Sequence, residues 1–432
     1  MRAVIAGQGY VGLPLAVRAA EVGHDVVGFD VDEARVKRLA AGESYVEDIP
    51  ADRLGAALAS GRYRASHRPR DCAGFDIAVV TVPTPLRDGV PDLSHIEECG
   101  RMLARYLRPG ATVVLESTTY PGTTEELLAP LLEEGSGLLA GRDFHLGYSP
   151  ERIDPGNPEW RLENTPKVIS GIDAASLEVV RDFYGSLVER TVEVSSCRSA
   201  ELTKLLENTF RHVNIALVNE LAVFAHDLGI DVWEAIDAAS TKPFGYLRFT
   251  PGPGVGGHCL PIDPSYLSWR VQRALGRSFR FVELANDVNS HMPDYVVRRL
   301  VAALNERRAA VNGSRVLLLG LAYKRNTGDA RETPAARVAQ LLLRMGAEVR
   351  AADPHVVEGV HIGDGLPGAG AVVRVEATPE ELAAADAVVL LADHDAFDYA
   401  AVAAHARYVL DCRRRLGASG GEVGKGAVVE IL

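Results

Sequence analysis

The chain has 432 residues, of which 47% are hydrophobic and 24% are charged, and its formal net charge at pH 7 is −12. This length predicts two or three domains, and the composition is typical of a globular protein and argues against disorder. The acidic balance argues against a nucleic-acid partner, and no run of about 18 apolar residues is present to predict a membrane span.

The first α/β region opens the chain. Apolar, β-branched runs predict strands separated by helical or loop segments, at residues 2–6, 25–30, 75–83, 112–119, 145–152 and 167–171. One helix is expected after the first strand, ending near Val22, and another near residues 94–106. This alternation predicts a parallel, doubly wound sheet, so we expect a Rossmann domain over residues 1–198.

A long-helix region follows. The stretch from Ala200 to Leu228 has apolar residues at helical spacing and contains no proline or glycine before its end, and a second long helix is predicted from Phe281 to Leu304. Between them, residues 250–264 are rich in glycine and proline and are expected to form a loop. We expect a central helical domain over residues 199–311.

The α/β pattern restarts at Gly313. A strand, a helix and a strand ending near residue 355 parallel the opening of the chain, and two further apolar runs predict additional strands. We therefore expect a second, Rossmann-like domain over residues 312–432. The predicted fold class is α/β, with two doubly wound domains bridged by helices and a reacting centre between them.

The glycine turn after the first strand has the sequence Gly-Gln-Gly-Tyr-Val-Gly. Gly7 permits a tight turn, Gly9 lets the backbone approach a pyrophosphate, and Gly12 lets the helix pack closely on the strand. Asp30 ends the next strand, where a carboxylate accepts hydrogen bonds from a ribose and repels a 2′-phosphate. The pattern favours NAD over NADP, although Arg35 lies near enough in sequence to accept a 2′-phosphate.

The five cysteines are scattered and lack CxxC spacing (Cys72, Cys99, Cys197, Cys259 and Cys412). We therefore expect neither disulfides nor a metal site, and a cytoplasmic location, which the lack of a signal-peptide pattern also favours. Cys259 differs from the others because it lies on the glycine-rich loop, where a thiolate can act as a nucleophile. Its neighbour His258 is a weaker candidate for the base, since adjacent side chains tend to point apart.

Lys204 and Asn208 are four residues apart, so they share one face of the first long helix. Taken alone, this pair would more often be a solvated helix face. Beside a thiol and an acid, it has the composition of a catalytic site.

Seven motifs occur in order: GQGYVGLPLA, VPTP, ESTTYPGTT, SPERIDPG, ELTKLLENTF, PGPGVGGHCLPIDP and GLAYKRNTGDARETP. With them the chain resembles, over nearly its whole length, the family of NAD-dependent nucleotide-sugar 6-dehydrogenases (the UDP-glucose/GDP-mannose dehydrogenase family). The resemblance implies oxidation of a hexose C6 alcohol to a carboxylate with two NAD⁺. Cys259 would hold the aldehyde as a thiohemiacetal, which is then oxidised to a thioester and hydrolysed.

The resemblance also implies roles for individual residues. Lys204 and Asn208 would stabilise an oxyanion, Asp263 would act as general base, and Thr118 and Glu151 would position water. Cofactor contacts beyond the glycines, Asp30 and Arg35 would come from Tyr10, Val11, Thr84, Thr118 and Arg331. Contacts to the nucleotide sugar would come from Tyr148, Glu151, Arg152, Lys204, Asn208, Arg248, Phe249, Gly252, Gly256 and Lys324. Arg248 would reach the site of a neighbouring subunit, so the resemblance implies at least a homodimer.

Two departures bear on the substrate. UDP-glucose members of the family often carry a second glutamate where this chain has Pro155, and a lysine where it has Ile262. The combination present here is more similar to the branch that acts on UDP-N-acetylglucosamine or UDP-N-acetylmannosamine. A UDP-glucose or dTDP-glucose dehydrogenase of a polysaccharide or secondary-metabolite pathway remains an alternative.

Two other classes of protein share some of these features. A two-electron β-hydroxyacid dehydrogenase also joins a Rossmann domain to a helical one, but it needs neither the loop at 248–264 nor the region at 313–432. A non-catalytic NAD-sensing or scaffold protein would have no reason to keep Lys204, Asn208 and Cys259 together.

Overall fold

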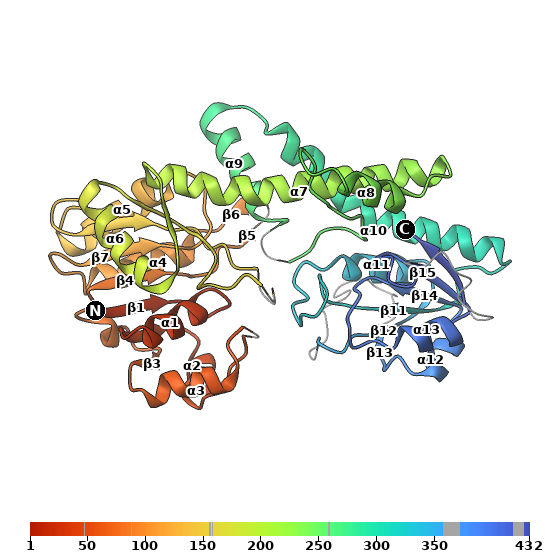
Figure 1. Ribbon diagram of the computed structural model, residues 1–432, viewed down its shortest axis with the longest axis horizontal. Coiled ribbons are helices and arrows are strands. Elements are labelled where there is room, and N and C mark those ends of the chain that lie inside the picture. The colour runs from red at the N-terminus through yellow and green to blue at the C-terminus, as the bar shows by residue number, and fades with distance from the viewer. Residues whose placement is uncertain are drawn as a thin grey trace. The chain divides into compact units, whose positions relative to one another are not determined.

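The computed structural model describes residues 1–46, 48–87, 89–154, 157, 159–257, 260–356, 372–417 and 427–432. Cys259, His258 and Pro155 lie outside the described residues. The chain forms two compact units: residues 1–207 with 265–277, and residues 208–264 with 278–432 (Figure 1). In the described part of the chain, no helix is long and apolar enough to cross a membrane.

The first unit is built on an eight-stranded sheet with the strand order β10-β9-β8-β7-β4-β1-β2-β3. Its strands are β1 (Arg2–Ala6), β2 (Asp25–Phe29), β3 (Tyr63–Ser66), β4 (Ile77–Val80), β7 (Thr112–Leu115), β8 (His145–Tyr148), β9 (Lys167–Gly171) and β10 (Thr191–Glu193). The order reverses between β1 and β4, which is the place where doubly wound sheets bind ligands. The predicted Rossmann fold is confirmed, although β8 and β9 pair antiparallel while the other neighbours are parallel.

Helices connect these strands. They are α1 (Gly12–Glu21), α2 (Glu33–Ala40), α3 (Ala51–Ala59), the 3-10 helix η1 (Pro69–Cys72), α4 (Ser94–Ala104), the π-helical turn η2 (Thr124–Leu128), α5 (Ala129–Ser136) and α6 (Ala174–Leu187). A two-stranded hairpin joins β5 (Leu86–Arg87) to β6 (Val90–Pro91). Helix α1 is buried along most of its length, and with Ile5 and Val79 it forms part of one apolar core.

Two helices contribute residues to both units. Helix α7 (Cys197–Asp227) belongs to the first unit up to Glu207, and α9 (Asp263–Leu275) belongs to it from Ser265. The helix predicted from Ala200 to Leu228 is therefore present with slightly different ends. Helix α9 was not predicted, and its first two residues lie within the segment expected to be a loop, at 250–264.

The second unit contains α8 (Val232–Ser240), α10 (Arg280–Glu306) and a six-stranded parallel sheet with the order β13-β12-β11-β14-β15-β16. Its strands are β11 (Arg315–Leu319), β12 (Glu348–Ala352), β13 (Val373–Arg374), β14 (Ala387–Leu390), β15 (Tyr408–Asp411) and β16 (Val428–Ile431). Its other helices are α11 (Pro334–Arg344), α12 (Pro379–Ala384) and α13 (Tyr399–His405). Val296, Leu300 and Leu304 of α10 pack with α11 and the sheet in one core.

Candidate functional site

The glycine turn after β1 combines two kinds of glycine. Gly7 has φ +97°, and a Cβ there would lie 2.6 Å from the carbonyl oxygen of Thr81. A Cβ on Gly12 would collide with the carbonyl oxygen of Gly7. A Cβ on Gly9 would meet no atom within 4 Å, so packing within the protein does not require that glycine. The space above Gly9, at the start of α1, therefore suits the close approach of a pyrophosphate.

Asp30 follows β2 and is 4% exposed. Its carboxylate accepts hydrogen bonds from the backbone N–H of Gln8 (2.8 Å) and of Asp32 (3.0 Å), and from Arg35 Nη1 (2.9 Å). Arg35 is thus paired with Asp30, and its guanidinium also lies 5.6 Å from the ring centre of Tyr45. These contacts fix a carboxylate beside the glycine turn, where the ribose of a dinucleotide is held in Rossmann folds.

The other expected cofactor residues differ in their surroundings. Tyr10, Val11 and Thr118 are half-buried, and Thr84 is buried with its carbonyl accepting a hydrogen bond from Tyr266 (2.9 Å). Arg331 belongs to the second unit, where its side chain forms a paired contact with Asp329 (2.6 and 2.9 Å).

Lys204 and Glu151 lie together in the first unit. Lys204 is 7% exposed, and its Nζ donates to the carbonyl oxygen of Glu151. Glu151 is 8% exposed, its Oε1 accepts the backbone N–H of Ile153, and its buried Oε2 has no partner in the described part of the chain. A buried carboxylate oxygen without a partner costs free energy, so Oε2 is suited to bind a water or a substrate hydroxyl.

Two further expected substrate residues flank Glu151. Arg152 pairs with Glu207 (2.6 Å) and donates to the carbonyl oxygen of Pro166. Tyr148 is fully buried, with its hydroxyl 3.4 Å from the carbonyl oxygen of Ser117.

Asn208 and Asp263 form a buried pair in the second unit, as Lys204 and Glu151 do in the first. Asn208 Nδ2 donates to Asp263 Oδ2 at 2.5 Å, and the two residues are 5% and 1% exposed. Lys204 and Asn208 are therefore both buried, unlike the solvated face that their spacing alone would suggest. Each lies next to a carboxylate residue that the family resemblance singles out.

The glycines of the 250–257 loop are explained largely by packing within the second unit. A Cβ on Gly256 would lie 2.7 Å from the carbonyl oxygen of Glu332. Gly257 has φ +82°, donates its N–H to the carbonyl oxygen of Arg331 (2.9 Å), and lies against the ring of Tyr323. This loop is thus joined to the segment that carries Lys324, whose Nζ lies 6.0 Å from the Tyr323 ring centre.

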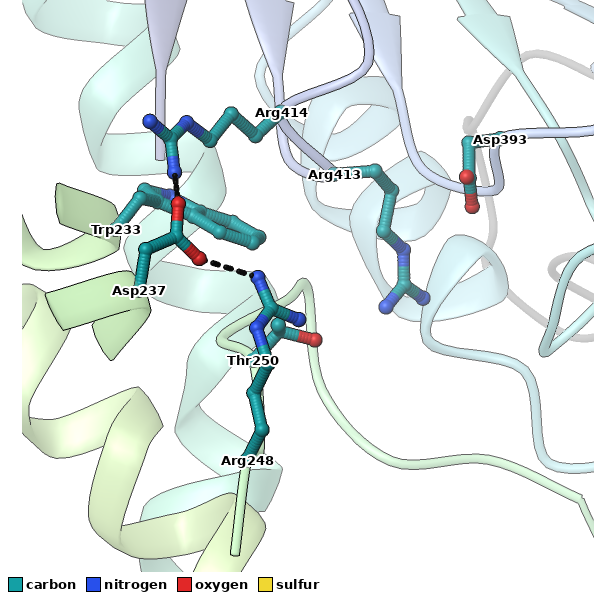
Figure 2. Close-up of a pocket in the computed structure, with 7 residues that line it drawn as sticks. All are labelled: Trp233, Asp237, Arg248, Thr250, Asp393, Arg413 and Arg414. Carbon is teal, nitrogen blue, oxygen red and sulfur yellow. Dashed lines mark hydrogen bonds and ion pairs between the residues drawn. The ribbon is translucent and has the colours of Figure 1, made fainter. Parts of the chain in front are cut away.

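A cavity of about 360 Å³ lies in the second unit, at the carboxyl ends of β14 and β15 (Figure 2). Its lining residues are Trp233, Asp237, Arg248, Thr250, Asp393, Arg413 and Arg414. Asp237 bridges Arg248 (2.8 Å) and Arg414 (2.6 Å), and these hydrogen bonds hold the pKa of its carboxyl below the usual value. Three arginines face two aspartates, so the cavity favours an anion.

Figure 2 shows Arg413 between Asp393 and the segment that carries Arg248 and Thr250. A Cβ on Gly252 would lie 2.7 Å from Arg413 Nη1, so this loop and the end of β15 are in close contact. Phe249 is half-buried, and its ring packs edge-on against Phe210 with ring centres 5.8 Å apart. Arg413 and Arg414 were not predicted from the sequence. The sequence feature that could have indicated them is a run of three arginines at the end of a predicted strand.

Comparison with known proteins places this geometry in context. Three family descriptions match in order: the UDP-glucose/GDP-mannose dehydrogenase family NAD binding domain (residues 1–188), its central domain (198–291) and its UDP binding domain (317–418). A UDP-N-acetyl-D-mannosamine dehydrogenase from Pyrococcus horikoshii is 36% identical over 398 residues, covering 92% of this chain and 90% of that protein. A UDP-N-acetyl-D-glucosamine 6-dehydrogenase from Pseudomonas aeruginosa is 38% identical, covering 82% and 83%.

Solved structures are similar over the same extent. A UDP-D-ManNAc dehydrogenase from Pyrococcus horikoshii has a TM-score of 0.87 at 32% identity and covers 100% of this chain and 99% of that one. A UDP-glucose dehydrogenase from Pyrobaculum islandicum has a TM-score of 0.85 at 31% identity, covering 99% and 96%. Overall fold similarity therefore does not discriminate between these sugars.

Proposed function

The chain belongs to the UDP-glucose/GDP-mannose dehydrogenase family, and from this premise we propose that it oxidises the C6 hydroxyl of a UDP-N-acetylhexosamine to a carboxylate. As a member of the family it is an NAD-dependent nucleotide-sugar dehydrogenase. The observation that carries the choice of sugar is the similarity over at least four fifths of the chain to enzymes named for UDP-N-acetyl-D-mannosamine and UDP-N-acetyl-D-glucosamine. UDP-glucose and dTDP-glucose are the competing substrates.

The Gly9 turn and Asp30 would hold NAD⁺, which would supply the hydride acceptor for each of the two oxidations. Asp263 takes the proton of the C6 hydroxyl as the first hydride leaves, which produces an aldehyde. The Cys259 thiolate then adds to the aldehyde carbon, and the oxyanion that forms takes back the proton held by Asp263 to give a thiohemiacetal. Loss of a second hydride and of the hydroxyl proton converts it to a thioester, and water releases the acid and the thiol.

The described side chains support this division of roles. An ammonium has three donors, so Lys204 can keep its bond to the Glu151 carbonyl and still reach a substrate oxyanion. Asn208 is oriented by Asp263, and its amide can assist in stabilising the same charge. Thr118 and Glu151 Oε2, which has no partner among the described residues, would hold the hydrolytic water.

We assign binding of the nucleotide diphosphate to the arginine-lined cavity of the second unit. Arginine binds phosphate oxygens in a planar, bidentate manner, and Arg413 adds to the loop at 248–252 expected from the sequence. Gly256 and Lys324 would contribute from the adjoining segments. In this proposal residues 1–198 bind NAD, 199–311 form the central domain and 312–432 bind the nucleotide.

A homodimer accounts for the apolar face of the second unit. Leu217, Leu221, Phe224 and Leu228 are 45–72% exposed and follow helical spacing along α7, while Phe281 on α10 is 67% exposed. A second copy covering this face would bury these side chains, and a shift of Arg248 away from Asp237 would let it reach the partner's site. The four described cysteines are free thiols, which supports a reducing, cytoplasmic location.

The substrate is tested by measuring kcat/KM with NAD⁺ and UDP-N-acetylglucosamine, UDP-N-acetylmannosamine, UDP-glucose or dTDP-glucose. The proposal predicts that one of the two N-acetylated donors exceeds both glucose donors by at least about tenfold. A preference for UDP-glucose or dTDP-glucose would contradict the choice of sugar but keep the enzyme class.

A further inference from the structure

Glu201 is a fully buried carboxylate in α7, one helical turn before Lys204. Its Oε2 accepts the backbone N–H of Gly122 (2.5 Å), and its Oε1 accepts the backbone N–H (2.9 Å) and the hydroxyl (2.6 Å) of Thr124. All three donors are neutral. In the described part of the chain, no lysine or arginine forms an ion pair with Glu201.

Burial without a cation raises the pKa of Glu201 to about 7, although the hydrogen bonds from Thr124 and Gly122 act in the opposite direction. Among the described residues, Glu125 and Cys197 interact electrostatically with this carboxyl. Glu125 of η2 raises its pKa further by charge repulsion, and the thiol of Cys197, at the start of α7, has its own pKa raised chiefly by burial. The group therefore changes charge near neutral pH.

The segment that Glu201 holds leads directly from Thr118. Gly122 has φ +106°, and a Cβ there would lie 2.7 Å from Glu126 Oε1, so the backbone at this point is tightly confined. On another side, the ring of Tyr120 packs against Trp269 of α9, with ring centres 5.2 Å apart. Arg270 of α9 lies over the same ring and pairs with Glu126 (2.7 Å). The 118–124 segment is thus clamped between α7 and α9.

We propose that Glu201 is a positioning residue for the 118–124 segment, which includes Thr118. Its ionised carboxylate fixes this segment relative to Lys204, which lies on α7 together with Glu201. The inference rests on the catalytic roles proposed above for Thr118 and Lys204. The ionised group offers a lone pair to each of the three donors. Protonation turns one carboxyl oxygen into an O–H, so either that O–H faces an N–H donor or the Thr124 hydroxyl must reverse to accept from it, and in both cases the attachment of the segment is weakened.

The charge required for positioning has a cost in stability. The pKa is higher in the folded chain than in the unfolded chain, where a glutamate titrates near its ordinary value, so the folded protein binds more protons between the two values. Stability therefore falls as pH rises through this window, while the proposed positioning improves. A residue with a purely structural role would not link these two opposite trends.

The test compares kcat of the wild-type 432-residue chain and of its Glu201→Gln variant from about pH 5.5 to about pH 8.5. An amide cannot accept hydrogen bonds from donors on both sides, so the variant should lose about tenfold in kcat at the upper end. At the lower end the wild type is itself protonated, and the two should agree within about twofold. Taking the ratio of the two enzymes removes the titration of other groups.

Thr124→Val is the second variant, because it removes one hydrogen bond to the carboxylate at nearly constant volume. It should raise the pKa of Glu201 and move the acid limb of the kcat profile upward by about 0.5–1 unit, leaving kcat near pH 8.5 within about twofold of wild type. Glu125→Gln is the matched control: this half-exposed carboxylate directly follows the segment and pairs with Arg198 of α7 (3.0 Å), but it is not one of the groups that bond Gly122 or Thr124 to Glu201, so its variant should show no fall in kcat at high pH.

A loss in Glu201→Gln that is the same at every pH, together with an unmoved limb in Thr124→Val, would overturn the proposal. The pH dependence of unfolding provides a reading that needs no substrate. As pH rises from about 4.5 to about 7, the wild type should lose stability relative to Glu201→Gln, and Thr124→Val should show the same loss extended to higher pH. A wild type without this stability loss would equally refute the inference. Failure of every sugar donor would instead refute the proposed function.

Discussion

The two sheets carry an aspartate at the same place, after the second strand, but its hydrogen-bond partners differ. Asp30 follows β2 in the first unit, and Asp353 follows β12 in the second. Asp30 bonds two backbone N–H groups and Arg35. Asp353 accepts four backbone N–H groups, from Leu321, Ala322, His355 and Val356 (2.6–3.0 Å), together with Nε2 of the buried His394 (3.0 Å).

The two units also differ in the connection from the first strand of the sheet to the helix that follows it. In the first unit only five residues separate β1 from α1, so the start of the helix lies directly beside the glycine turn. In the second unit β11 ends at Leu319 and α11 begins at Pro334, and the long connection packs against the 256–257 turn. One sheet thus presents a cradle for a dinucleotide, whereas the other uses its aspartate to hold a loop that carries Lys324. Equivalent positions in one fold therefore need not share a function.

The largest effect is expected for Asp353→Asn. Burial raises the pKa of Asp353, but hydrogen bonds from His394 and the backbone outweigh it and leave the pKa well below its usual value. The wild type should lose this stabilisation as pH falls below about 4, because the carboxylate must then take up a proton. The variant cannot accept all five bonds, so its free energy of unfolding at neutral pH should fall by about 3 kcal/mol, measured by urea denaturation.

Within the first glycine turn, Gly12→Ala and Gly9→Ala should separate packing from ligand binding. The alanine at position 12 collides with backbone and should lower the free energy of unfolding by about 2–3 kcal/mol. The alanine at position 9 meets nothing, so stability should change by less than about 0.5 kcal/mol while the Kd for NAD⁺ rises at least about tenfold. An unchanged Kd in Gly9→Ala would remove the proposed pyrophosphate contact.

Asp30→Asn should mainly affect the cofactor. Loss of a charged acceptor for the ribose hydroxyls should raise KM for NAD⁺ by about 10–30-fold, with a loss of about 1 kcal/mol in stability, less than for Asp353→Asn. Initial rates at saturating sugar and a denaturation curve measure the two quantities. Equal losses of stability in Asp30→Asn and Asp353→Asn would contradict the inference that Asp30 serves the cofactor and Asp353 holds the loop.

The smallest effect is expected for Arg35→Ala. The Arg35 side chain is 39% exposed, and a partly exposed ion pair contributes little, so KM for NAD⁺ should change by less than about threefold. Because Asp30 remains, NADP⁺ should stay a poor cofactor in both forms. A large loss of NADP⁺ activity in Arg35→Ala would show instead that this arginine accepts a 2′-phosphate.

Local patterns predicted the parts of the site that are local. The strand–turn–helix–strand unit with Asp30, and the placement of Lys204 and Asn208 on one helix, follow from spacing along a few turns of chain. Family resemblance supplied candidate roles for the rest, while the antiparallel pairing of β8 with β9 was missed because it depends on partners distant in sequence.

The arginine cavity was missed for the same reason. It combines α8, the 248–250 segment and the residues after β15, which spacing along the chain does not relate. The glycines at 256 and 257 suggested a nearby ligand, yet the ring of Tyr323 and the backbone of residues 331–332 already require them. A glycine-rich loop indicates a close approach without indicating what approaches.

The measurement that tests the central claim most directly is the number of NADH molecules formed for each sugar consumed by the wild-type enzyme with its best donor. The four-electron mechanism predicts two NADH and a uronic acid, and it predicts that Cys259→Ser completes almost no turnover. One NADH with a free aldehyde, unaffected by that substitution, would contradict the account.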